Sequence, residues 1–63
     1  MDGSESASRQ LLLTLMVMSE KLGNRRLADA LLVDATRWLR IYPYDAVIWE
    51  ARAQLRAAFP PLH

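Results

Sequence analysis

Hydrophobic positions recur at helical spacing in three segments of the chain. The first segment carries a stripe at positions i, i+4, i+7 and i+11, formed by Leu11, Leu15, Met18 and Leu22. This spacing places apolar side chains on one face of an amphipathic helix. No segment alternates between apolar and polar residues with the period of two that a half-buried strand requires. The pattern therefore predicts an all-α protein with a three-helix antiparallel arrangement.

Start and stop signals predict where the three helices lie. Gly23 supplies the left-handed position that commonly ends a helix, and Asn24 is a favourable N-cap for the next one. Pro43 lacks a backbone N–H and restricts the residue before it, so the second helix ends near Tyr42. Asp45 can then cap a third helix. We expect helices over residues 8–22, 25–42 and 46–59, a domain over residues 9–59, a flexible N-terminal segment over residues 1–8, and a C-terminal tail over residues 60–63.

The second and third helices each present one main apolar face, whereas the first helix is apolar around most of its girth. The predicted core faces of the second and third helices contain Leu27, Ala28, Leu31, Leu32, Ala35, Trp38, Leu39, Tyr42, Ile48, Ala51, Leu55, Ala58 and Phe59. In the first helix, Leu12 and Met16 widen the stripe, and Leu13 and Val17 form a second flank. Because a helix in a small bundle needs only one apolar face, the excess predicts contact with another chain through Leu13, Met16 and Val17.

Size and composition exclude several classes of protein. A domain near 63 residues buries only about 60% of the surface of its unfolded chain, so a partner is an expected source of further stability. The chain has no cysteine, and its one histidine is the last residue, so we expect neither a disulfide nor a metal site. It also lacks a glycine-rich phosphate loop. We therefore expect that the protein is not an enzyme and uses no cofactor.

Charge and hydropathy narrow the expected partners and location. The formal net charge of +1 is far from the strongly basic balance of a nucleic-acid binder, so no nucleic acid is expected. The apolar run over residues 11–18 is shorter than the roughly 20 residues of a membrane span. Acidic rather than basic residues precede that run, unlike in a signal peptide. We expect a cytoplasmic protein, and the bias toward leucine, alanine and arginine indicates a GC-rich, bacterial genome.

Residues 23–53 resemble the tetratricopeptide (TPR) family of helical repeats. Ala28, Leu32 and Ala35 match the small, large and small positions of the second helix of a repeat. The segment Pro43–Trp49 is similar to the Pro-x-x-Ala-x-x-Trp crossing into the next repeat. The resemblance implies one and a half repeats that bind another protein. The implied function is that of an adaptor, an assembly subunit, or a chaperone that covers an apolar export substrate.

Four residues of the second and third helices are further candidates for partner contact. Trp38 and Trp49 either anchor helix packing or act as interface hot spots, where tryptophan is enriched. Asp34 falls by helical angle within an apolar arc, where an unpaired carboxylate is costly. It is expected either to pair with Arg37 or to bond across an interface. Arg52 follows Trp49 by three residues and can make a cation–π contact with its ring.

Two alternative functions remain open at this stage. The first is a structural homo-oligomer in which copies of the first helix pair with one another, most commonly with two-fold symmetry. The second is a small DNA-binding regulatory protein. That alternative requires Arg37 and Arg40 to lie alongside Arg52 and Arg56, since two arginines on one helical turn are ordinarily a solvated face.

Overall fold

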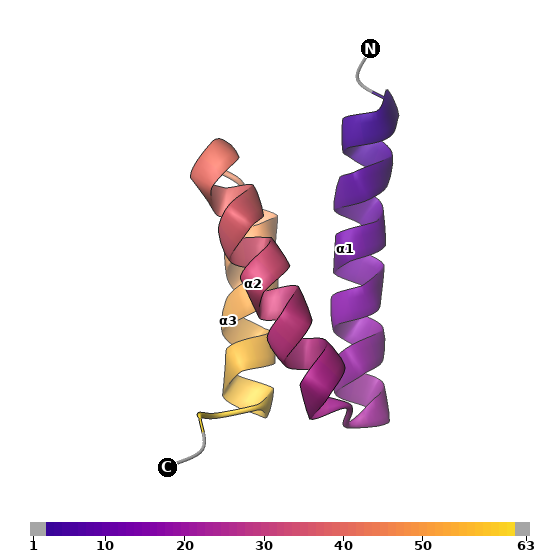
Figure 1. Cartoon of the computed structure of the whole chain (residues 1–63). Helices are drawn as coiled ribbons and strands as arrows, with labels where there is room; N and C mark the ends of the chain where they lie inside the picture. Colours follow the sequence, from indigo (N-terminus) through magenta and orange to yellow (C-terminus); the bar gives the residue numbers. More distant parts are fainter. Residues whose placement is uncertain (1–2, 62–63) are drawn as a thin grey trace.

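A computed structural model describes residues 3–61, and they form three α-helices with no strand among them. The helices are α1 (Gly3–Leu22), α2 (Arg25–Ile41) and α3 (Ala46–Ala58). Figure 1 shows that successive helices run in opposite directions, and that α1 and α2 diverge from their connecting turn. Each helix contacts the other two. The predicted all-α, three-helix fold class is confirmed.

The two connections between helices form as their local sequences predict. Gly23 has a φ of 63°, in the left-handed region that glycine adopts without a Cβ clash. The Asn24 side chain accepts a hydrogen bond of 3.1 Å from the N–H of Leu27 and so caps α2. Asp45 caps α3 in the same way, accepting from the N–H of Ile48 at 3.3 Å.

The first helix begins earlier than the sequence pattern predicts. It starts at Gly3 instead of residue 8, so residues 3–8, which the sequence pattern assigns to a flexible segment, belong to the helix. Residues 1–2 lie outside the described part of the chain. Glu5 lies in the first turn, where its negative charge interacts favourably with the helix dipole. The C-terminal ends of α2 and α3 lie one residue earlier than expected, because Tyr42 and Phe59 are their C-caps, and the remaining ends match the expected ones.

The core lies where the three helices meet. Its buried hydrophobic side chains are Leu12, Met16, Ala28, Leu31, Ala35, Leu39, Ile48 and Leu55. Ala28 and Ala35 are completely buried, and their small side chains allow close approach between helices. The one buried polar side chain in the described chain is Ser19, whose hydroxyl donates to the carbonyl of Met16 at 2.8 Å.

The core residues of α1 are not those of its most regular apolar stripe. Leu12 and Met16, which enter the core, each follow a stripe residue by one position. Met16, predicted as a partner-contact residue, is only 2% exposed and packs in the core cluster. By contrast, Leu11 and Leu22 are 59% and 70% exposed. The packing of α2 and α3 against Leu12 and Met16 therefore leaves Leu11, Met18 and Leu22 on the surface.

Candidate functional site

An apolar groove with a volume of about 340 Å³ lies between α1 and α2. It is lined by Ser8, Leu11, Leu12, Leu15, Leu31, Asp34, Arg37, Trp38 and Ile41. Leu11 and Ile41 are both well exposed along it. The groove thus combines an apolar lining with two oppositely charged side chains. Such a surface is typical of sites that hold the apolar face of a partner helix.

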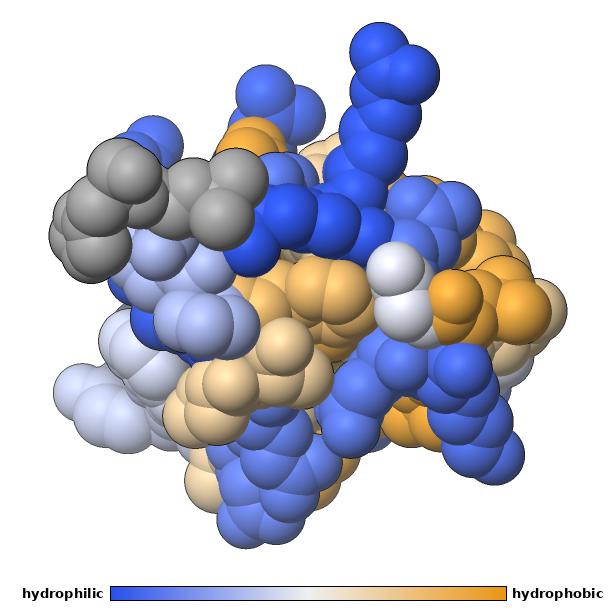
Figure 2. Space-filling view, turned by 90° about the horizontal axis from the view of Figure 1, so that it is seen from below, coloured by the Kyte–Doolittle hydropathy of each residue, from blue (hydrophilic) through white to orange (hydrophobic). Residues whose placement is uncertain are grey.

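The apolar surface continues along α1 beyond the groove. We call Leu11, Leu15, Met18 and Leu22 the α1 stripe. Its last two members are large hydrophobic side chains that remain exposed near the α1–α2 turn. Seen from the end of the molecule that holds this turn, apolar surface lies between strongly hydrophilic side chains (Figure 2). Exposed apolar surface of this kind commonly marks an interaction site.

One carboxylate joins all three helices beside the groove. Asp45, at the start of α3, accepts two hydrogen bonds from the Arg9 guanidinium of α1, at 2.7 and 2.9 Å. It also accepts a hydrogen bond of 2.9 Å from the indole N–H of Trp38 in α2. The side chain of Asp45 is only 12% exposed. This network orients the Trp38 ring in the groove and links α1 to α3.

The network sets the protonation state of Asp45. Hydrogen bonding from the Arg9 guanidinium holds the pKa of the Asp45 carboxyl well below its usual range. Burial opposes this shift, and the N–H donors of Trp38 and Ile48 lower the pKa further. The same hydrogen bond raises the pKa of Arg9. Both groups therefore stay ionised in the folded protein at neutral pH.

We expect part of the acid destabilisation of the fold to depend on Asp45. Its pKa is lower in the folded state than in the unfolded state, where it is about 3.9. The unfolded state therefore binds more protons as the pH falls, and the stabilisation is lost below about pH 4. Urea unfolding followed by circular dichroism at pH 7 and at pH 3 measures this loss. Asp45→Asn should lose less stability between these values than the unmodified protein, and equal losses would contradict the assignment.

The structure brings only some of the predicted contact residues together. Asp34 and Trp38 both line the groove, where Asp34 is exposed and makes no ion pair within residues 3–61. Leu13 and Val17 line a separate shallow hollow on α1. Leu13 packs partly against the core, and Val17 is 52% exposed. The second flank of α1 is therefore not continuous with the groove residues of α2.

Trp49 and Arg52 form a third cluster, on the outer side of α3. The indole N–H of Trp49 donates to the Pro43 carbonyl at 2.8 Å, while the ring stays 48% exposed. The Arg52 guanidinium lies 5.9 Å from the ring centroid, so the predicted cation–π contact is confirmed. Arg52 also donates to the hydroxyl of Thr36 in α2 at 3.1 Å. Trp49 thus bonds to the loop before α3. The buried side chain in the first turn of α3 is that of its neighbour Ile48.

Three residues of the groove and its supporting network were missed by the partner-contact prediction. Leu11 belongs to the most regular stripe of the first helix, and this signal could have identified it. Ile41 is the last residue of α2. At a helix end, the hydrophobic pattern does not indicate whether a neighbouring element covers the side chain. No sequence signal identifies Arg9, because its partner Asp45 lies 36 positions away along the chain.

Comparisons with known proteins add no family assignment to this geometry. Neither the family models, nor the curated proteins, nor the solved structures include a match to this chain. Within residues 3–61, none of the three helices combines the length and the apolar character needed to cross a bilayer.

Proposed function

We propose that this protein is a small helical interaction module that holds the apolar face of a helix from another protein chain. One observation carries the proposal: the groove between α1 and α2 exposes Leu11 and Ile41 in a chain whose core is small. Burying such side chains contributes about 25 cal/mol per Å² of apolar surface. Adaptors, chaperones and assembly subunits all use a surface of this kind.

The lining of the groove favours a helical occupant. The groove between α1 and α2 has an apolar lining, and the exposed side chains along α1 recur at helical spacing. Asp34 and Arg37 supply charges of opposite sign that can set the register of the bound helix. The TPR resemblance supports the same proposal. It implies only one and a half repeats, whereas arrays of such repeats generally need about three to be stable, so a partner would cover the open face.

A second candidate function is self-association through α1. The α1 stripe has the alternating spacing of four and three residues that is found in the seams of coiled coils. Met18 and Leu22 extend it beyond the groove, at 47% and 70% exposure. The α1 helix of a second copy of this chain could therefore pack against the α1 stripe, since its own stripe is apolar in the same way.

Photo-crosslinking distinguishes these two functions. We would place p-benzoyl-L-phenylalanine at position 41 in cells that carry the gene, irradiate them, and measure the adduct mass. We expect a covalent adduct with a different protein chain. An adduct with a second copy of this chain would support self-association instead, and no adduct at all would contradict both proposals. The same amino acid at Glu50, on the exposed side of α3, is the positional control.

A pair of matched substitutions tests whether the groove is the contact surface. Leu11→Glu should abolish the adduct at position 41 because it places a charge in the apolar groove. Val47→Glu, at a similarly exposed position of α3, should leave the adduct unchanged. Helix content, measured by circular dichroism, should be retained in both variants, since the two native side chains are 59% and 54% exposed. Equal crosslinking in both variants would argue against the groove.

A further inference from the structure

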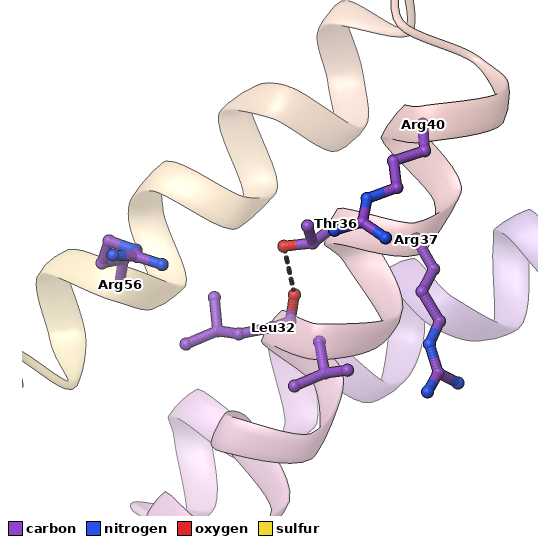
Figure 3. Close-up of a pocket in the computed structure, with 6 residues that line it drawn as sticks. Leu32, Thr36, Arg37, Arg40 and Arg56 are labelled. Atoms are coloured by element: carbon purple, nitrogen blue, oxygen red, sulfur yellow. Dashed lines mark hydrogen bonds between the residues drawn. The ribbon is translucent and has the colours of Figure 1, made fainter.

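A second concave surface, with a volume of about 230 Å³, lies between α2 and α3. We call it the arginine groove, and its lining consists of Leu32, Val33, Thr36, Arg37, Arg40 and Arg56 (Figure 3). It shares only Arg37 with the apolar groove between α1 and α2. Its function can therefore be tested independently of the proposed binding of a helix.

The arginines of this groove have no carboxylate partner in the described chain. Within residues 3–61, the two ion pairs are Arg9 with Asp45 and Arg25 with Asp29. Arg37, Arg40 and Arg56 take part in neither pair, and all three are exposed. The lining of the groove contains no acidic residue. The lining of the groove thus carries positive charge and has no acidic side chain of its own.

The arrangement of the three guanidinium groups indicates the shape of the ligand. Figure 3 shows Arg40 beside Thr36, Arg37 pointing away from the centre of the groove, and Arg56 coming from the neighbouring helix. The groups are spread out and do not converge on one point. A row of separate carboxylates therefore suits them better than a single phosphate, because each planar guanidinium can hold one carboxylate in a bidentate pair.

The floor of the groove is aliphatic. Leu32 packs partly against the core, and Val33 is 52% exposed. The hydroxyl of Thr36 is already engaged, since it donates to the Leu32 carbonyl at 2.9 Å and accepts a hydrogen bond from Arg52. The floor thus offers contact to an apolar side chain, with few free polar groups between the arginines.

We propose that the arginine groove docks an acidic segment of a partner protein. The segment places carboxylates on Arg40 and Arg56 and an aliphatic side chain on Val33. Charge complementarity speeds association and selects the partner, while the aliphatic contact adds affinity. An acidic segment that lacks apolar side chains is expected to bind more weakly.

The same surface is less suited to nucleic acid. The DNA-binding alternative requires four arginines side by side. Three of them line this groove, and the fourth, Arg52, does not. However, Arg52 is held by Thr36 and lies over the Trp49 ring. The floor has no aromatic side chain on which a base could stack, and the net charge of the whole chain is only +1.

Peptide binding to the purified full chain tests the proposal. The probe is a fluorescein-labelled peptide of 12 residues, in which glutamates surround two leucines, and binding is followed by fluorescence anisotropy. The double variant Arg40→Glu with Arg56→Glu should bind it at least about tenfold more weakly. A peptide with lysines in place of the glutamates should not bind the unmodified protein. A peptide with alanines in place of the leucines should bind more weakly.

A charge-matched control separates the groove from general electrostatic attraction. Lys21→Glu with Arg26→Glu makes the same change in net charge at two exposed positions outside the groove. Its affinity for the acidic peptide should stay within about twofold, because exposed charges far from a ligand are largely screened at physiological salt. Equal losses in the two double variants would overturn the proposal, as would no binding of the acidic peptide to the unmodified protein.

Two further measurements address folding and nucleic acid. Arg40→Gln with Arg56→Gln removes the charges without adding repulsion, so it should weaken binding in the same direction while the circular dichroism spectrum is unchanged. Retained affinity in this variant would overturn the proposal. A fluorescein-labelled single-stranded DNA of 12 nucleotides is the competing probe. If the DNA bound more tightly than the acidic peptide, and its binding depended on Arg40 and Arg56, the ligand of the groove would be nucleic acid and the proposal would be overturned.

Discussion

Asp45→Ala is expected to lower the free energy of unfolding by about 3 kcal/mol. Loss of the N-cap of α3 accounts for about 1 kcal/mol of this. The remaining 2 kcal/mol or so reflects the lost charged hydrogen bonds, which leave the partly buried indole N–H of Trp38 without its acceptor. Since a domain of 63 residues has a total stability of roughly 3 to 9 kcal/mol, this loss is about a third or more of the total.

Urea unfolding followed by circular dichroism measures the effect of this substitution. Asp29→Ala is the matched control, because Asp29 is also a carboxylate in an ion pair, with Arg25 at 3.6 Å, but its side chain is 56% exposed. Such exposed pairs contribute about 0.5 kcal/mol or less. If the two variants lost similar stability, the contribution assigned to the hydrogen bonds of Asp45 with Arg9 and Trp38 would be wrong.

Ile48→Ala is expected to lower the free energy of unfolding by about 3 to 4 kcal/mol. Ile48 is completely buried and belongs to the core cluster that α3 shares with α1 and α2. Truncation to alanine removes buried methyl and methylene groups and leaves a cavity that helices already in close contact fill only in part. The variant should unfold at a clearly lower urea concentration than the unmodified protein, as followed by circular dichroism.

Val47→Ala tests whether this loss comes from burial or from helix propensity. Val47 is the neighbouring β-branched residue on α3, but it is 54% exposed. Its truncation should change stability by about 0.5 kcal/mol or less, since exposed substitutions away from special features have small effects. Alanine is also the better helix former. A comparable loss at the two positions would mean that the core does not lie where α3 meets the other helices.

Both large effects concern the attachment of α3, and this attachment also supports the apolar groove. Asp45 caps α3 and accepts the hydrogen bond that orients the Trp38 ring. Ile48, one turn later, places α3 against the buried alanines of α2. Weakening either contact is therefore expected to disturb the groove between α1 and α2, even though neither side chain lines it.

Local sequence signals were enough to predict the three helices and the two connections between them. Gly23, Asn24 and Asp45 act on backbone groups within three residues, so their effects can be read from the local sequence. The core faces of α2 and α3 were also predictable, since each of these helices has one main apolar face. The start of α1 was missed because small polar residues carry no periodic signal.

The surfaces were decided by the tertiary structure alone. On α1, apolar residues surround most of the helix, so only the packing of α2 and α3 decides that Met16 is buried and Leu11 exposed. The network around Asp45 joins Arg9 from 36 positions away, and the arginine groove exists only because α3 lies beside α2. Helix periodicity specifies which residues share a face, whereas the neighbours that cover a face depend on how helices distant in sequence pack together.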